Sequence, residues 1–200
     1  MVGAFGTWGG WSALTAVGTI GAVAVAVFLQ WWISRTERQR TPELTVVKDE
    51  LWKFSSGGWP SLRLAVRNAA GKHAAHDVQV SVDRVAQANG ATAYLLPNTW
   101  LRWANLAGQA TVNIPAGAPR YVEIGSFVDG TAAAEPDVPV LNLATGASGG
   151  LPVKKSPCIV DLTVTATNCD ARRWRITITF LPSEVDSKKP QDVTLEVHAT

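Results

Sequence analysis

The stretch "SLRLAVR", residues 61–67, alternates apolar and polar side chains with a period of two. Leu62, Leu64 and Val66 fall on one face of an extended strand, and two arginines fall on the other face. The stretch "DVQVSVD", residues 77–83, repeats this alternation with three valines. Each stretch predicts a strand with one buried face and one solvated face, which is typical of antiparallel sheets.

The same alternation continues to the end of the chain, over residues 160–167, 173–180 and 193–197. Weaker strand candidates are residues 44–54, 100–104, 110–114 and 120–127. Turn residues separate these segments, and no segment after residue 41 has a sustained helical period. We therefore predict an all-β domain over residues 43–200, with eight or nine strands in an antiparallel sandwich or a partly open barrel.

Residues 62–82, "LRLAVRNAAGKHAAHDVQVSV", resemble the hairpin of bacterial immunoglobulin-like modules of the adhesion-related type. In those modules a strand ends in Asn, a Gly-containing turn follows, and a small residue precedes a V-x-V-x-V strand. The matching residues here are Asn68, Gly71, Ala75, Val78, Val80 and Val82. Two residues, Ala69 and Ala70, stand between Asn and Gly where the pattern usually has one. The resemblance covers 21 of 200 residues and implies an immunoglobulin-like sandwich, but no chemistry.

The chain before this domain has a different composition. Met1 to Ser34 contains no Lys, Arg, Asp or Glu, whereas the other 166 residues carry all 34 of them. The 22 residues from Ser12 to Ile33 include only four polar ones, and a helix of that length reaches about 33 Å, enough to cross a bilayer. We predict a transmembrane helix over residues 11–34, after a short tail over residues 1–10.

Tryptophans flank the apolar run on both sides, and arginines follow it. Indoles favour the headgroup layers of a membrane, and basic flanks mark its cytoplasmic side. The residues predicted at the membrane interface are Trp8, Trp11, Trp31, Trp32, Arg35, Arg38 and Arg40. Because Pro42 disfavours helical continuation, residues 35–42 are predicted to form a basic juxtamembrane linker.

The arginine flank predicts a single-pass protein of a bacterial cytoplasmic membrane, with its N-terminus outside and its β domain in the cytoplasm. This order of elements, with a composition rich in Ala, Val and Arg, resembles uncharacterised single-span membrane proteins of actinobacterial style. Adhesion-related modules are typically extracellular, so that resemblance implies the inverse topology. A cleaved signal peptide fits less well, because no basic residue precedes the apolar run and aromatic residues end it.

Small residues recur every fourth position in the apolar run, at Gly18, Ala22 and Ala26. Such a ridge lets a second helix approach closely, which predicts helix association and a homo-oligomer formed through the membrane helix. Small residues are also abundant throughout this chain, so chance explains the spacing equally simply. The sequence leaves both interpretations open.

No residue set in the sequence predicts a catalytic, cofactor or metal site. "GASGG", residues 146–150, matches the G-x-S-x-G elbow of α/β-hydrolases, but Ser148 lacks the flanking strand and helix that an elbow requires. His73 and His76 form an H-x-x-H pair on a predicted turn, where their imidazoles do not meet as they would on a helix. The net charge of +2 is too small to indicate a nucleic-acid partner.

Cys158 and Cys169 begin and end "CIVDLTVTATNC", which alternates like a single strand. The ends of one unbroken strand of this length lie about 36 Å apart, whereas a disulfide needs α-carbons within about 7 Å. The sequence therefore predicts no disulfide between these two cysteines.

Trp100, Arg102 and Trp103 are the candidate partner surface. The odd offset between the two tryptophans means that both cannot face the core from one regular strand. One of them either joins a recognition surface or packs at the rim of the core. The long connection over residues 129–157 is either a recognition element or a tolerated insertion.

We predict a membrane-anchored, noncatalytic β-sandwich that recruits or assembles protein partners at the membrane. The alternative is a cell-surface binding or adhesion module with inverted topology, and a third hypothesis is an enzyme whose site forms only in three dimensions. Membrane lipid and a protein are the expected partners, with no cofactor. An exposed apolar patch or sheet edge favours the interaction module, whereas a pocket lined by titratable groups favours the enzyme.

Overall fold

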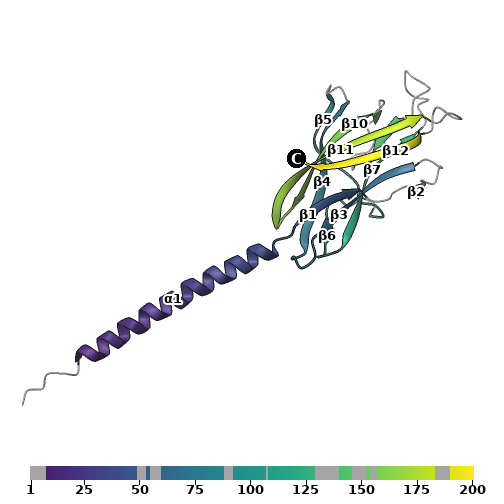
Figure 1. Cartoon of the computed structure of the whole chain (residues 1–200). Coiled ribbons are helices and arrows are strands. Elements are labelled where there is room, and N and C mark those ends of the chain that lie inside the picture. The colour runs from purple at the N-terminus through teal and green to yellow at the C-terminus, as the bar shows by residue number, and fades with distance from the viewer. Residues whose placement is uncertain are drawn as a thin grey trace, which may run out of the picture. The chain divides into compact units, whose positions relative to one another are not determined.

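The computed structural model describes residues 8–48, 53–54, 60–87, 92–106, 108–128, 140–145, 152–153, 157–182 and 190–200. It contains one helix followed by strands, in two compact units that comprise Met1–Thr41 and Pro42–Thr200 (Figure 1). The boundary between the units lies next to Pro42, close to the limit predicted for the β domain. Each unit is described separately below.

The N-terminal unit is a single helix, α1 (Trp8–Arg40), of 33 residues. It is longer than predicted, because residues 35–40 of the expected linker continue the helix. The helix ends where Thr41 N donates to the carbonyl oxygen of Arg38 and Pro42 follows. The segment Val17–Arg40 is long and apolar enough to cross a membrane and none of its most apolar window is buried, although length and composition also fit a signal sequence.

The β domain consists of two antiparallel sheets, which confirms the predicted all-β class. The first sheet has the order β1-β3-β7-β8-β9, with β2 also paired to β3. Its strands are β1 (Leu44–Lys48), β2 (Lys53–Phe54), β3 (Pro60–Asn68), β7 (Pro119–Val128), β8 (Val140–Leu143) and β9 (Pro152–Val153).

The second sheet has the order β12-β11-β10-β4-β5, with β6 also paired to β4. Its strands are β4 (Ala75–Gln87), β5 (Thr92–Trp100), β6 (Val112–Ile114), β10 (Cys158–Ala166), β11 (Cys169–Pro182) and β12 (Pro190–Ala199). The predicted number of eight or nine strands is not confirmed, since twelve are present in the described part of the chain. Sequence reasoning missed β5, because its segment "TAYLLPNTW" contains a proline and lacks clear alternation.

The predicted hairpin over residues 62–82 does not form, because β3 and β4 lie in different sheets and do not pair with each other. The intervening residues instead carry the chain from the first sheet to the second. Gly71 lies in this connection with φ of 76°, a left-handed conformation that glycine adopts without steric cost. The strand assignment was correct at both ends, but the pairing was wrong.

The apolar faces of the strands form one core between the sheets. Leu62, Leu64 and Val66 of β3 are fully buried, as are the valines of β4 at positions 78, 80 and 82. Burial of one such side chain contributes about 1.5–3 kcal/mol relative to exposure. A surface ion pair contributes about 0–1 kcal/mol, so the alternating apolar residues dominate the stability of the domain.

A short segment, Leu101–Ala104, joins the two sheets through backbone hydrogen bonds. Leu101 N donates to the carbonyl oxygen of Val80 in β4 at 2.8 Å, and Ala104 N donates to that of Tyr121 in β7 at 2.8 Å. An isolated bridge also pairs Trp103 with Val122. One side of the sandwich is therefore closed by the main chain, as in a partly open barrel.

Asn68 fixes the point at which the chain leaves β3. Its side chain is 1% exposed. The Oδ1 atom accepts a hydrogen bond from Glu43 N at 3.1 Å, and the Nδ2 atom donates to the carbonyl oxygens of His73 at 2.7 Å and Ile114 at 3.2 Å. One side chain thus satisfies backbone groups at the entry to β1, in the connection after β3, and at the end of β6.

We expect Asn68→Ala to lower the free energy of unfolding by about 2–4 kcal/mol, because it removes one buried and two partly buried hydrogen bonds to backbone groups. Asn113→Ala is the matched control, since the Asn113 side chain accepts a single exposed hydrogen bond from Asp77 N. It should cost less than about 1 kcal/mol. Urea denaturation of the detergent-solubilised chain measures both, and equal losses in the two variants would contradict the role given to Asn68.

Candidate functional site

The outer face of the second sheet carries a cluster of charged residues that the sequence analysis did not identify. It arises from a β-bulge in β4, where Arg84 pairs with Asp161 but Val82 pairs with Leu162. The extra residue is Asp83, and the bulge places both Asp83 and Arg84 toward the outer face. The sequence signal was present, because the buried valines of β4 change from a spacing of two to a spacing of three after Val82.

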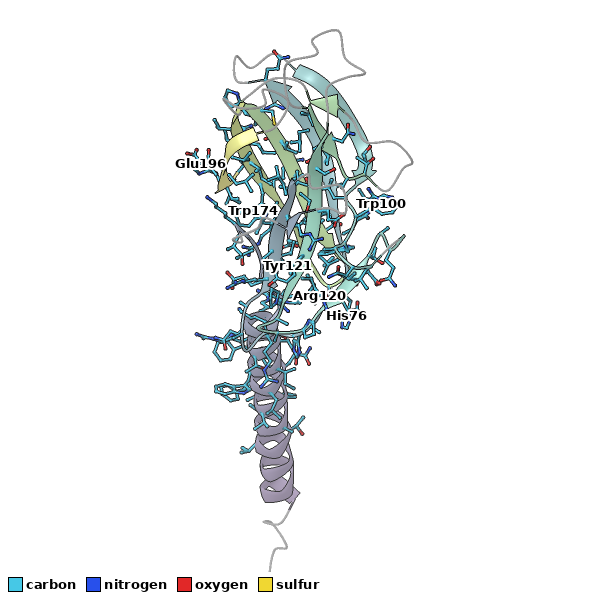
Figure 2. The ribbon with its side chains drawn as sticks, turned by 90° about the vertical axis from the view of Figure 1, so that its right-hand side faces the viewer. His76, Trp100, Arg120, Tyr121, Trp174 and Glu196 are labelled. Carbon is cyan, nitrogen blue, oxygen red and sulfur yellow. The ribbon has the colours of Figure 1, made fainter. Side chains whose placement is uncertain are left out.

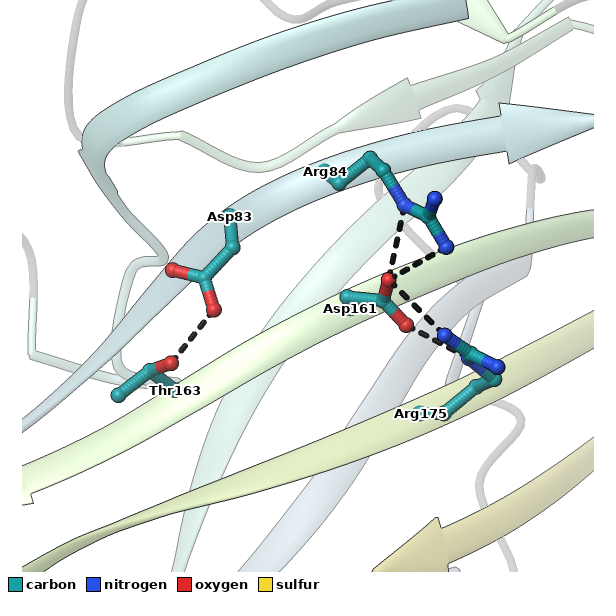
Figure 3. Close-up of polar contacts among 5 residues, drawn as sticks. All are labelled: Asp83, Arg84, Asp161, Thr163 and Arg175. Carbon is teal, nitrogen blue, oxygen red and sulfur yellow. Dashed lines mark hydrogen bonds and ion pairs between the residues drawn. The ribbon is translucent and has the colours of Figure 1, made fainter. Parts of the chain in front are cut away.

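Asp161 of β10 lies between two arginines from the neighbouring strands (Figure 3). Its Oδ1 atom accepts a hydrogen bond from Arg175 Nε of β11 at 2.8 Å, and its Oδ2 atom accepts one from Arg84 Nε of β4 at 2.9 Å. On the same face, the Thr163 hydroxyl donates to the carboxylate of Asp83. These contacts connect β4, β10 and β11 across the solvent-facing side of the sheet.

The electrostatics of this cluster favour a structural role over catalysis. Partial burial alone would raise the pKa of Asp161, but the hydrogen bonds and positive charges of Arg175 and Arg84 outweigh burial and hold its pKa below the usual 3.8. The same contact raises the pKa of Arg175. A carboxylate with a lowered pKa is a weak base at neutral pH, so Asp161 is suited to holding strands together and poorly suited to proton transfer.

The structure separates the three residues of the predicted partner surface. Trp103 is 2% exposed and its Nε1 atom donates to the carbonyl oxygen of Ala110 at 3.2 Å, so Trp103 belongs to the core and cannot contact a partner. Trp100 is half-buried and Arg102 is exposed. The odd offset therefore predicted correctly that only one tryptophan faces the core.

Trp100 and Arg102 project from the chain where it passes from the second sheet to the first. Trp100 pairs with Ser81 of β4, on the solvent-facing side (Figure 2). Arg102 lies two residues further along the chain. Its backbone N donates a hydrogen bond to the carbonyl oxygen of Ala144 at 3.1 Å, and its carbonyl oxygen accepts one from Glu123 N at 2.8 Å. Tyr121 of β7, which is 37% exposed, lies beside this segment, because its carbonyl oxygen accepts from Ala104 N.

We name Trp100, Arg102 and Tyr121 the crossover surface. It combines two aromatic side chains with one arginine, and these residue types are enriched at protein interfaces. Sequence reasoning missed Tyr121, because its position beside Ala104 depends on pairing between segments that are distant in the chain.

The histidines and cysteines behave as separate residues. His73 and His76 are exposed, and the described residues contain no group of three or more His, Cys, Asp or Glu side chains that could hold a metal ion. Cys158 and Cys169 are both free thiols. Burial raises the pKa of Cys158 to about 12, which makes that thiol unreactive at neutral pH.

The predicted disulfide geometry needs one correction. Residues 158–169 are not a single strand, since a turn at Thr167 and Asn168 separates β10 from β11. Cys158 pairs with Ile178, whereas Cys169 pairs with Ala166. The two cysteines therefore lie at opposite ends of a hairpin, about 26 Å apart by strand rise, which again precludes a bond between them.

Two sequence candidates lie wholly or mainly outside the described residues. Ser148 of the hydrolase-like motif is one of them, so the structure does not test it. Of the connection over residues 129–157, the structure describes residues 140–145, 152–153 and 157, which include β8 and β9.

Most of the predicted membrane-interface residues are exposed on α1. Trp31 and Trp32 are 51% and 54% exposed, and Arg35, Arg38 and Arg40 are exposed as well. Trp8 and Trp11 belong to the helix, but their side chains are outside the description. The small residues Gly18, Ala22 and Ala26 are exposed, which leaves their predicted association with a second helix open.

We expect Asp161→Asn to lower the free energy of unfolding by about 1 kcal/mol at neutral pH, through loss of its ion pairs. Because the pKa of Asp161 is lower in the folded chain than in the unfolded chain, wild type holds this advantage above about pH 4. The advantage should shrink as the pH falls through the lowered pKa. Urea denaturation between about pH 7 and pH 3 measures it.

Arg173→Gln is the matched control for this pH dependence, since Arg173 occupies the same strand and face two residues from Arg175. It should keep the wild-type pH profile. A difference between wild type and Asp161→Asn that stays constant down to about pH 3 would contradict the electrostatic role of Asp161.

Comparisons with protein-family models, curated proteins and solved structures found no match to this chain. The resemblance of residues 62–82 to immunoglobulin-like modules of the adhesion-related type therefore stays a prediction. The function is argued below from the chain's own residues and their geometry.

Proposed function

We propose that this chain is a membrane-anchored, noncatalytic β-sandwich module that recruits or assembles protein partners at a membrane. The proposal is carried by one observation: an exposed apolar helix and a separate antiparallel domain follow each other with only residues 41–43 between α1 and β1. An apolar helix with no buried window needs an apolar environment such as a bilayer to remove its side chains from water. The β domain has its own core and does not need the helix to complete it.

The crossover surface is the partner-binding site that we assign to this module. The backbone of Arg102 is fixed on both sides by hydrogen bonds, so its exposed guanidinium is presented from a rigid support. Trp100 lies two residues before Arg102, and Tyr121 lies beside Ala104, so both add exposed or half-buried aromatic area around this crossing segment. Aromatic side chains have few rotatable bonds and lose little conformational entropy on binding, and arginine is among the residue types enriched at interface hot spots, which supports a protein interface at this position.

We propose that the β domain is cytoplasmic and the N-terminus lies outside, because Arg35, Arg38 and Arg40 follow the apolar segment. The expected result for fusions after Thr200 is an active cytoplasmic reporter and an inactive alkaline phosphatase. Protease added to intact cells should leave the β domain whole, whereas lysis should expose it.

An active phosphatase with cleavage from outside would reverse the topology and favour the cell-surface binding module. Sequencing of the mature N-terminus adds a second check. A chain that starts at Met1 and stays in the membranes during carbonate extraction would support the anchor. A chain that has lost its N-terminal segment and is released from the membranes would identify a signal sequence.

We expect a photo-crosslinking amino acid at Tyr121 to form an adduct with a protein partner in cells. Trp100→Ala should lower the yield of that adduct at least about tenfold, because truncation of an interface tryptophan commonly costs about 2 kcal/mol or more. Position Glu196, exposed on β12, is the matched control for the crosslinker. If the adduct yields at positions 121 and 196 are equal and Trp100→Ala does not change them, the crossover surface is not the binding site.

A further inference from the structure

We infer that one face of α1 binds the phosphate group of an anionic phospholipid, an inference that rests on the membrane anchoring proposed above. Trp31, Ser34, Arg35, Arg38 and Gln39 form this face and line an open groove of about 390 Å³. Ser34 and Arg35 follow Trp31 by three and four positions, and Arg38 follows them by four and three, so these four residues share one side of the helix. We call these five residues the arginine face.

One cation of the arginine face, Arg35, is held against an aromatic ring. The Arg35 guanidinium carbon lies 5.3 Å from the ring centroid of Trp31, which is within cation–π distance. A guanidinium stacked on an indole keeps N–H groups at its edge for hydrogen bonds to phosphate. Arg38 lies almost one turn further along the same face, so that two guanidiniums flank one groove.

Other charged residues of this segment lie elsewhere on the helix. At about 100° per residue, Glu37 is about 120° around the axis from Trp31, and Arg40 is about 180° from it. Glu37 is the only acidic residue between Trp31 and Arg40. The arginine face is therefore positively charged, while Arg40 supplies a cation of the same chemistry on the opposite side.

The order of residues along the helix favours a lipid as the occupant. Phe28 precedes the arginine face and packs near Trp31 and Trp32, with ring centroids 6.0 and 6.1 Å apart. Along the helix toward its C-terminus, apolar and aromatic side chains are therefore followed by cations. From the centre of a bilayer outward, the acyl chains of a phospholipid are likewise followed by its phosphate. Arg35 and Arg38 are separated by about 4.5 Å along the axis, which fits within one headgroup layer of roughly 5–8 Å.

The experiment uses the purified full-length chain and native mass spectrometry with phosphatidylglycerol or phosphatidylcholine added in detergent. Wild type should retain phosphatidylglycerol preferentially, and Arg35→Gln with Arg38→Gln should lower that preference by about five-fold per arginine. The matched control, Arg40→Gln, should keep the wild-type preference. Trp31→Ala should weaken it, since the indole holds Arg35 in place.

Equal losses in Arg40→Gln and the double variant would show a diffuse charge effect and overturn the groove. No preference in wild type would overturn the inference as well. Carbonate extraction of cell membranes separates this result from the proposed anchoring: a chain that stays in the membrane but lacks lipid preference contradicts this inference alone, and a chain that is extracted contradicts the anchoring and the lipid site together.

Discussion

The hydrogen bonds of Asn68 hold the place where the chain must change sheets. At the end of β3 the backbone could turn back and form a hairpin, which would place the apolar faces of both strands on the same side of one sheet. Asn68 instead satisfies backbone groups of Glu43, His73 and Ile114 in a buried position, so three separate segments meet around one amide. The valines of β4 can then face the leucines of β3 across the core. Because an unpaired buried backbone group costs about 1–3 kcal/mol, these hydrogen bonds stabilise the observed connection from β3 to β4.

A second irregularity shapes the outer face of the second sheet. The bulge at Asp83 lets two consecutive polar residues of β4 reach the solvent-facing side, where Arg84 and Arg175 share Asp161. Three central strands are thereby connected outside the core as well as inside it. Within this cluster the carboxylate of Asp161 is paired with Arg84 and Arg175, whereas Arg102 of the crossover surface is exposed.

Several features were predictable because they depend on local chemistry. Alternation identified β3, β4, β10, β11 and β12, and the apolar run identified α1. The helix nevertheless continued to Arg40, since nothing in residues 35–40 disfavours a helix and only Pro42 stops it. The strand β5 escaped prediction because its pairing with β4 outweighs a proline that argues against a strand. Tyr121 escaped because its position beside Ala104 arises from segments that pair only in the folded chain.

The sequence by itself determined the fold class, the apolar helix and the buried side of the strands that alternate regularly. These features follow from the period of apolar residues and from the lack of charge before Arg35, which act within a few residues. Tertiary structure alone decided which strands pair, that Trp103 rather than Trp100 enters the core, and that Asp161 meets two arginines. The physical reason is that these contacts join residues far apart in the chain, and their energies exist only once both sheets are assembled around a common core.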